Sequence, residues 1–294
     1  MEQGEDMKNL DTCASIWKVL SELDADRKSL LINLGGGVVT DLGGFIAATF
    51  KRGIAFVNVP TTLLSMVDAA VGGKTGINLD SLKNQIGVIR PAELVLIDSK
   101  FLQTLPANEM RSGLAEMLKH GLIKSETVWK RLLRLEAMNS EDLDGLIQES
   151  IAIKEEIVAQ DPTEKNIRKS LNYGHTLGHA IESYFLESSL KTKLLHGEAV
   201  AAGMVMETYI SNELCGFPQE KLEEISRAII RLYGKIELQE KEFEEIKNLM
   251  KFDKKNEKGN INFVLLKDIG RPVMDCQVPD EVLNNSCSYY LNIS

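Results

Sequence analysis

The stretch LLINLGGGVVTDLGG, residues 30–44, decides the fold of the first part of this chain. The apolar run Ser29–Leu34 predicts a buried strand, and the glycines at 35–37 lead from it into helical spacing. In such a strand-to-helix turn, glycines let backbone amides approach a phosphate, and the helix N-terminus favours the negative charge. The spacing is not G-x-G-x-x-G, and tight packing alone also explains such a turn. The residues by themselves therefore leave both readings open.

On the C-terminal side of this turn, Ile54–Val59 and Leu94–Ile97 predict two further strands with helical stretches between them. This alternation predicts a parallel α/β layer. After Asp98 the spacing is helical almost throughout, so we predict an α/β nucleotide-binding domain at 1–98 and a mostly α-helical domain at 99–294. The predicted helices of the second domain are Asn108–Ile123, Asp142–Ala159, Thr163–Tyr184, Glu198–Leu214, Gln219–Leu232 and Glu240–Met250. The run Ile261–Leu266 predicts a late strand or hairpin arm.

Composition limits the class of protein. The chain has 294 residues, of which 44% are hydrophobic and 26% charged, as expected of a soluble globular protein. A net charge of -9 without a basic block argues against nucleic-acid binding. The four scattered cysteines form no C-x-x-C pair, which fits a reducing cytoplasm. No apolar run approaches the roughly 20 residues of a membrane span, and no signal peptide is recognisable, so we expect a cytoplasmic protein.

The segment from residue 68 to residue 84 combines charged and amide side chains with glycines. Its polar members include Asp68, Lys74, Lys83 and Asn84. A solvated loop is the ordinary reading of such lysines. However, Gly72 and Gly73 permit a backbone bend that would turn Lys74 inward. Acidic, lysine and amide side chains in one segment suit a polyhydroxylated, anionic substrate.

Histidines give the strongest chemical signal. Arg168, Asn172, His175 and His179 follow one another at spacings of four, three and four, which predicts one helical face. His196 begins another predicted helix whose small residues at 197–203 permit close approach of a neighbouring helix. We therefore expect His196 to lie near the helix that carries the other two histidines.

A carboxylate is available to complete a metal site. Glu116 lies on the polar stripe of its predicted helix, together with Lys119. One carboxylate and two imidazoles form an open three-ligand zinc site that leaves positions for substrate hydroxyls. Spacing alone leaves open which histidines bind, because His175 and His179 could also chelate one ion together.

Several motifs together resemble the 3-dehydroquinate synthases, a family of NAD- and metal-dependent sugar-phosphate cyclases. The resemblance extends over essentially the whole chain. Its motifs are Gly-Glu-Asp-Met-Lys at 4–8, the glycines at 35–37 with Asp41, Pro-Thr-Thr-Leu at 60–63, the segment 67–84, Leu-Ala-Glu at 114–116, Asn-Tyr-Gly-His-Thr at 172–176 and Leu-His-Gly-Glu-Ala-Val at 195–200.

The resemblance implies roles for individual residues. The implied metal ligands are Glu116, His175 and His196, with His179 beside the substrate. The implied NAD contacts are Glu5, Lys8, Gly37, Val38, Asp41, Thr61, Thr62, Lys74, Lys83, Phe101 and Thr104. The implied substrate contacts are Asp68, Lys74, Asn84, Lys119, Arg168, Asn172 and one lysine of Lys254 and Lys255, with Arg52 reaching across a homodimer interface.

The implied reaction converts 3-deoxy-D-arabino-heptulosonate 7-phosphate into 3-dehydroquinate and phosphate, a step of the shikimate pathway to chorismate and aromatic amino acids. The implied cofactors are NAD and one divalent metal, zinc or cobalt. Family members begin with a further strand-helix-strand segment before the motif at 4–8, and the resemblance implies that this chain lacks it.

Three other functions fit part of the pattern. A sister cyclase, such as a 2-deoxy-scyllo-inosose or valiolone-type synthase, would act on another sugar phosphate. Arg168, Asn172 and the pair Lys254 and Lys255 favour a carboxylated substrate instead. An iron-containing alcohol dehydrogenase would release NADH, and an inactive homologue would bind NAD without releasing phosphate.

Overall fold

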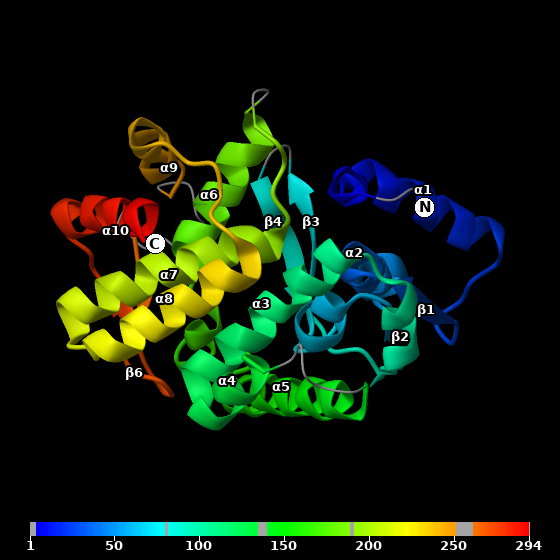
Figure 1. Ribbon diagram of the computed structural model, residues 1–294. Coiled ribbons are helices and arrows are strands. Elements are labelled where there is room, and N and C mark those ends of the chain that lie inside the picture. The colour runs from blue at the N-terminus through cyan, green and yellow to red at the C-terminus, as the bar shows by residue number, and fades with distance from the viewer. Residues whose placement is uncertain (1–3, 80–81, 135–139, 189–190, 251–260, 294) are drawn as a thin grey trace. The chain divides into compact units, whose positions relative to one another are not determined.

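The computed structural model describes residues 4–79, 82–134, 140–188, 191–250 and 261–293 (Figure 1). The chain divides into two compact units, Met1–Gly113 and Leu114–Ser294. The sequence-based boundary near Asp98 falls before this division. None of the described helices is long and apolar enough to cross a membrane.

Unit 1 is built on a three-stranded parallel sheet in the order β1-β2-β5. The strands are β1 (Leu30–Gly35), β2 (Ala55–Pro60) and β5 (Leu94–Val95). The helices are α1 (Leu10–Glu22) and α2 (Gly37–Thr49), with the short helices η1 (Glu5–Met7), η2 (Phe50–Arg52) and η4 (Ser99–Thr104). The predicted strands and parallel α/β layer are thus confirmed.

Helices α1 and α2 cover one face of this sheet. Phe45 and Ile46 of α2 pack with Cys13 of α1 in one buried cluster, against which Leu31 of β1 also packs. Gly43 lies so close to the strand that a Cβ there would be 2.0 Å from Oδ1 of Asn33. Glycine at this position therefore lets the helix lie directly on the sheet.

The opposite face of the same sheet is apolar and exposed. Leu30, Ile32 and Leu34 alternate along β1 and are 53%, 62% and 59% exposed. Leu94 and Leu96 at the other edge are 54% and 53% exposed. Parallel strands usually have both faces covered, so this uncovered face is unusual.

The segment read as a loop from Asp68 to Asn84 is regular structure for much of its length. A π-helix, η3 (Ser65–Ala69), precedes an antiparallel hairpin of β3 (Lys74–Leu79) and β4 (Leu82–Ile89). Glycines obscured this hairpin in the sequence. A Cβ on Gly76 would lie 2.7 Å from the carbonyl oxygen of Ile86, so glycine here permits close contact between the two strands.

Unit 2 is mostly helical, as predicted. Its helices are the C-terminal part of α3 (Ala107–Lys124), α4 (Glu126–Leu132), α5 (Ser140–Gln160), α6 (His175–Glu187), α7 (His196–Cys215), α8 (Gln219–Tyr233), α9 (Phe243–Met250) and α10 (Asp280–Asn292), with η6 (Ile167–Asn172) and η7 (Glu240–Glu242). The hairpin β6 (Phe263–Asp268) and β7 (Arg271–Cys276) confirms the predicted late strand.

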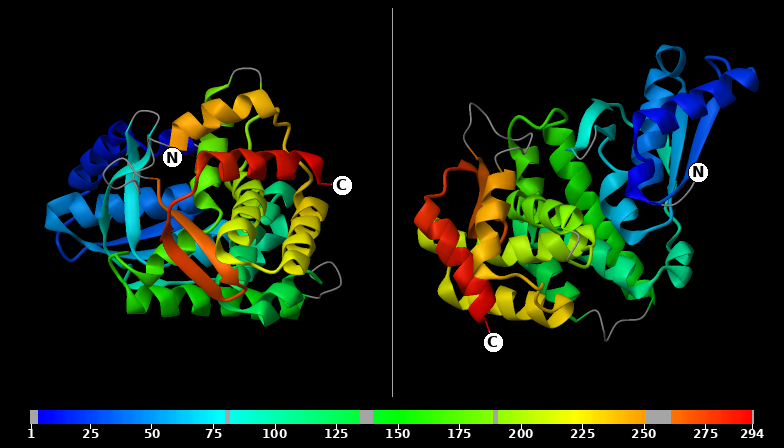
Figure 2. Two further views of the ribbon diagram at one scale, coloured as in Figure 1. Left: turned by 90° about the vertical axis from the view of Figure 1, so that its left-hand side faces the viewer. Right: turned by 90° about the horizontal axis from the view of Figure 1, so that it is seen from above.

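Helix α7 is the centre of unit 2. Its residues from Ala199 to Thr208 are buried without interruption, because α6, α8, α10 and β6 pack around it. Figure 1 shows α8 running alongside α7, and Figure 2 shows the β6–β7 hairpin from another side.

The prediction of one helix from Thr163 to Tyr184 is wrong. Oxygens of Asp161 accept hydrogen bonds from the amides of Lys165 at 3.0 Å, Asn166 at 2.6 Å and Arg168 at 3.1 Å. These bonds hold the chain in a turn before η6. Gly174, with φ of 77°, then separates η6 from α6. Arg168 and Asn172 therefore do not share a helix with His175 and His179.

Candidate metal centre and cofactor region

The pair α6 and α7 brings the histidines of unit 2 together. A Cβ on Gly203 of α7 would lie 2.1 Å from the carbonyl oxygen of Gly174, and one on Gly178 would lie 3.0 Å from Cα of Val200. Side chains are thus excluded where the two helices meet. The ring centroids of His175 and His196 are 5.4 Å apart, which confirms the predicted proximity.

A buried glutamate fixes the start of α6. Its N-cap residue, Gly174, has no side chain that could cap the helix. Glu207 of α7 takes this role: its Oε2 accepts the amide of Gly174 at 2.6 Å, and its Oε1 accepts that of Leu177 at 3.1 Å. Because Glu207 is fully buried, these bonds hold α6 and α7 in one register. Glu207 was not among the residues predicted from the sequence.

Glu116 of α3 meets two histidines at the buried end of this pair. Its Oε1 lies 3.3 Å from Nε2 of His175 and 3.5 Å from Nε2 of His196. Glu116 is 0% exposed, and neither carboxylate oxygen forms a well-oriented hydrogen bond to a described residue. A buried carboxylate facing two imidazoles is a donor set that fits zinc or a similar divalent metal.

The ligand atoms of His175, His179 and His196 also lie within 4.8 Å of one another. The geometry is therefore compatible with two ligand sets, one containing Glu116 and one containing three histidines. The set Glu116, His175 and His196 stays a prediction.

Charged neighbours shift the pKa values of two of the predicted ligands in opposite directions. Burial alone would raise the pKa of Glu116, but Lys119 and His175 outweigh it and hold the pKa well below its ordinary value. Burial opposes a charge on His196, yet Glu182 and Glu116 raise the pKa of that imidazole to about 10. The raised pKa of His196 marks a negative potential at that imidazole, which favours a cation there, whereas the lowered pKa of Glu116 reflects the positive charges of Lys119 and His175.

Other buried polar groups lie on α3 and α5. Lys119 contacts Oε2 of Glu116. Nδ1 of His120 lies 2.7 Å from Oγ of Ser150, and Lys154, one turn further along α5, is only 6% exposed. Lys154 was not predicted as a site residue, because a lysine in a helix usually lies on the solvated face. Lysines are rarely buried unless they are paired, so the burial of Lys154 marks it as a further candidate site residue.

Arg168 and Asn172 lie in η6 and contact the preceding turn. Arg168 is 1% exposed, and its Nη1 donates to the carbonyl oxygen of Pro162 at 2.7 Å. Nδ2 of Asn172 donates to Oε1 of Glu164 at 3.0 Å. Lys254 and Lys255 lie outside the described residues.

In unit 1, three predicted cofactor residues form one network. Nζ of Lys8, which is 4% exposed, lies 2.6 Å from Oδ2 of Asp41 and 3.7 Å from Oε1 of Glu5. Asn78 joins them: its side chain donates to Glu5 at 3.0 Å, and its backbone amide donates to the carbonyl oxygen of Lys8 at 2.8 Å. The structure thus ties the motif at 4–8 to α2 and β3.

Gly37 and Val38 form the first turn of α2, and no described side chain caps this helix end. This arrangement suits a phosphate. Thr62 contacts the same turn, since a Cβ on Gly36 would lie 3.0 Å from its Cγ2. Thr62 also accepts the amide of Ser65 at 3.2 Å, so its hydroxyl caps the helical segment that follows.

The other predicted residues of unit 1 are spread over several elements. Asp68 lies in η3, Lys74 and Lys83 lie on the β3–β4 hairpin with Asn84, Thr61 follows β2, and Phe101 and Thr104 lie in η4. Lys74 is exposed, so the predicted inward turn of this residue is not observed. Arg52 is also exposed and adopts a left-handed backbone with φ of 69°.

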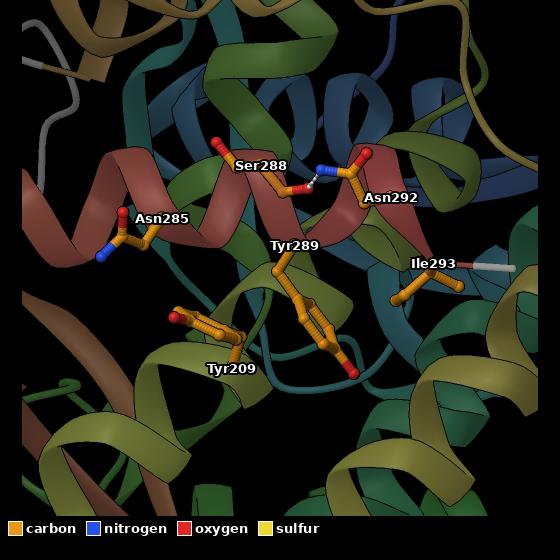
Figure 3. A pocket seen from close by; sticks show the side chains of 6 residues that line it. All are labelled: Tyr209, Asn285, Ser288, Tyr289, Asn292 and Ile293. Carbon is orange, nitrogen blue, oxygen red and sulfur yellow. Dashed lines mark hydrogen bonds between the residues drawn. The ribbon is translucent and has the colours of Figure 1, made fainter.

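A pocket elsewhere in unit 2 contains none of the predicted site residues. It has a volume of about 390 Å³ and is lined by Tyr209 of α7 and by Asn285, Ser288, Tyr289, Asn292 and Ile293 at α10 (Figure 3). The rings of Tyr209 and Tyr289 are 4.8 Å apart. This pocket lies more than three turns along α7 from His196.

Comparison with protein families gives two matches that together cover most of the chain. The model described as 3-dehydroquinate synthase N-terminal matches residues 1–112, and the model described as 3-dehydroquinate synthase C-terminal matches residues 113–256.

Two curated relatives are named 3-dehydroquinate synthase. The protein from Parabacteroides distasonis is 48% identical over 99% of this chain and 82% of its own length. The protein from Methylacidiphilum infernorum is 41% identical over 95% of this chain and 76% of its own length.

Solved structures of two other enzymes have the same fold. The 2-epi-5-epi-valiolone synthase of Streptomyces hygroscopicus subsp. jinggangensis 5008, with NAD+ and Zn2+ bound, is 25% identical with a TM-score of 0.89 and covers 100% of this chain and 82% of its own. A 2-deoxy-scyllo-inosose synthase complexed with carbaglucose-6-phosphate, NAD+ and Co2+ is 26% identical with a TM-score of 0.81, over 97% of this chain and 80% of its own.

Proposed function

Because this chain belongs to the 3-dehydroquinate synthase family, we propose that it converts 3-deoxy-D-arabino-heptulosonate 7-phosphate into 3-dehydroquinate and inorganic phosphate. It is an NAD- and metal-dependent lyase of the shikimate pathway. The observation that carries this conclusion is 48% identity over 99% of the chain to a 3-dehydroquinate synthase. The meeting of Glu116 with His175 and His196 supports it chemically.

The metal ligands that we propose are Glu116, His175 and His196, holding zinc or cobalt. Their Nε2 and Oε1 atoms already face one another, and the carboxylates of Glu116 and Glu182 beside His196 favour a cation there. When bound, the metal supplies Lewis-acid polarisation of substrate hydroxyls, and NAD supplies a reversible hydride acceptor. Three protein ligands leave coordination positions open for the substrate.

Lys119 and His179 flank this set and would act on the substrate phosphate. Lys119 supplies a fixed positive charge, because its ion pair with Glu116 holds it in the buried cluster. His179 is placed edge-on to His175, with ring centroids 5.1 Å apart, and can hold a proton there. Arg168 would bind the substrate carboxylate, with Asn172 beside it.

The remaining substrate assignments rest on the resemblance. They are Asp68, Lys74, Asn84, one lysine of Lys254 and Lys255, and Arg52 from a second subunit. The same holds for the homodimer that Arg52 implies and for a cytoplasmic location.

For NAD, the amides at the start of α2 would hold the pyrophosphate through Gly37 and Val38. The network of Glu5, Lys8 and Asp41 would hold the segment 4–8 against helix α2, beside this proposed pyrophosphate site. Thr61, Thr62, Lys74, Lys83, Phe101 and Thr104 complete the proposed NAD contacts.

The decisive experiment measures phosphate release from 3-deoxy-D-arabino-heptulosonate 7-phosphate with catalytic NAD and added zinc, beside a chelator control. We expect chelator-sensitive release, one dehydroquinate formed per phosphate, and no net NADH, because NAD would act as a hydride carrier that is regenerated within each turnover.

Parallel reactions separate the alternatives. Turnover of glucose 6-phosphate in preference to the heptulosonate would identify a sister cyclase, since carbaglucose-6-phosphate is the ligand of one structural relative. Stoichiometric NADH would identify a dehydrogenase. Bound NAD and zinc without phosphate release from any substrate would contradict the proposed activity.

A further inference from the structure

The second ring nitrogen of His196 meets a carboxylate that has no part in the proposed chemistry. Nδ1 of His196 lies 3.3 Å from Oε2 of Glu182. Its Nε2 lies 3.5 Å from Oε1 of Glu116. The imidazole therefore lies between two carboxylates, one on each side of the ring.

Glu182 occupies a fixed place on the ligand-bearing helix. It follows His175 by seven residues and His179 by three, so all three lie on one face of α6. The residue is 8% exposed, and Phe185 and Ile181 beside it are buried. A glutamate held in this way orients its partner better than a mobile surface carboxylate would.

His175 has the same arrangement with a different acceptor. Its Nδ1 lies 3.1 Å from the carbonyl oxygen of Tyr173, while its Nε2 faces Glu116. In both histidines, one nitrogen is engaged by an oxygen and the other points at the same carboxylate. Histidine ligands in metal sites commonly have this pattern, because the outer acceptor selects the tautomer that leaves Nε2 free to bind.

We propose that Glu182 is a positioning residue of the metal centre: it accepts Nδ1–H of His196 and thereby aims Nε2 of that ring at the metal. The assignment rests on the proposed metal site and adds a residue to it. Glu182 acts through His196 and does not itself touch the metal or the substrate.

The test uses three variants of the full chain: Glu182→Gln, Glu182→Ala and Glu187→Gln. Glutamine keeps the size of the side chain and an acceptor oxygen but removes the charge. Glu187 lies at the exposed end of the same helix and serves as the matched control. The zinc dissociation constant is measured without substrate by competition with a chromophoric chelator, and the melting temperature of metal-free protein is measured in parallel.

We expect Glu182→Ala to weaken zinc binding about 10- to 100-fold, the range typical of lost outer partners. Glu182→Gln should fall between this variant and the original, and Glu187→Gln should match the original. Nitrogen-15 NMR of the zinc-loaded protein should show His196 with a protonated Nδ1, and the chemical shift of that hydrogen-bonded Nδ1–H should change in Glu182→Ala but not in Glu187→Gln.

Two results overturn the proposal. Zinc binding by folded Glu182→Gln and Glu182→Ala within twofold of the original would show that His196 needs no outer acceptor. A second contrary result would be that Glu182→Ala lowers both the melting temperature and the zinc affinity, while Glu182→Gln changes neither. This would show that Glu182 contributes only packing. If the original chain binds no zinc, the metal site fails as well, whereas failure of Glu182 alone leaves the proposed function intact.

Discussion

At the scale of single residues, the metal centre depends on which side-chain nitrogen and oxygen atoms lie close enough together to bind one metal ion. Glu116 and His175 face each other through Oε1 and Nε2, and His179 is the neighbour that distinguishes the two possible ligand sets. Single substitutions on α6 therefore separate metal binding from substrate chemistry.

We predict that His175→Ala abolishes both metal binding and turnover, since it removes one of three protein ligands. His179→Ala should retain the metal and lose turnover. Elemental analysis after dialysis measures the metal, and phosphate release measures turnover. Loss of the metal from both variants would favour the three-histidine set, and an active, metal-replete His175→Ala would remove His175 from the site.

Asp161 gives a pH-dependent prediction. Burial would raise its pKa, but the amides of Lys165, Asn166 and Arg168 outweigh this and lower it below the ordinary value. A lowered pKa adds stability above the unfolded-state pKa of about 4, and this stability is lost as the pH falls through the folded-state pKa.

We therefore expect Asp161→Asn to be less stable than the original at pH 7, with the difference shrinking as the pH falls below about 4. Urea unfolding at a series of pH values measures this. Asp142, an exposed acid, provides the control as Asp142→Asn. A difference that stays constant from pH 7 to acid would show that the charge of Asp161 contributes nothing.

At the scale of elements, the contact between α6 and α7 determines where two histidines lie. The contact has space only for glycine at 203, because a Cβ there would meet the backbone oxygen of Gly174. Backbone cannot move aside as a flexible side chain can, so any larger residue must separate the helices.

We predict that Gly203→Ala lowers the free energy of unfolding by about 1–3 kcal/mol and weakens zinc binding. Gly145→Ala on α5 is the matched control, because a Cβ there meets only Nη2 of Arg131 at 4.0 Å. That change should stabilise the helix by up to about 1 kcal/mol. Denaturant titration with and without zinc measures both, and a neutral Gly203→Ala would contradict the tight contact.

The sequence predicted elements best where periodicity was strong and local. Helices α7 and α8 and strands β1 and β2 appear within one or two residues of their predicted bounds. The helix at 163–184 failed because Asp161 binds three amides of the following chain, a competition that hydrophobic spacing does not reveal. The β3–β4 hairpin was missed because its glycines are typical of loops, although here they permit strand contact.

The sequence predicted which types of residue form the candidate site, but not which other side chains contact them. His175, His179 and His196 drew attention because the chain has only four histidines, and the family resemblance then implied the set of His175, His196 and Glu116. Glu182 and Glu207 were not, because a glutamate in a helix looks solvated until the tertiary structure shows which group it faces. The role of a buried carboxylate depends on which group of the neighbouring element it contacts, and the sequence does not show that contact.

At the scale of the whole molecule, the two units bind different proposed ligands. Zinc would bind in unit 2, and the pyrophosphate of NAD would bind at the start of α2 in unit 1. Each ligand stabilises the native state that binds it and reduces local opening.

We predict that zinc slows amide hydrogen exchange at residues 116–120 and 174–182, whereas NAD slows it at residues 36–41. Mass-spectrometric exchange with each ligand alone and with both measures this. Magnesium, which prefers oxygen ligands, is the control for zinc. Protection by zinc confined to unit 1 would contradict the proposed metal centre.

The uncovered sheet face of unit 1 determines how the protein responds to its solvent. Leu30, Ile32 and Leu34 form a continuous apolar strip that is exposed to solvent. Sulfate and phosphate salts strengthen the tendency to bury such surface, and urea weakens it. Precipitants of this kind would therefore join molecules through β1 before they affect the helical unit. Sulfate would also compete for the sites proposed for phosphate, so one solute would promote association and inhibit the enzyme through two separate surfaces.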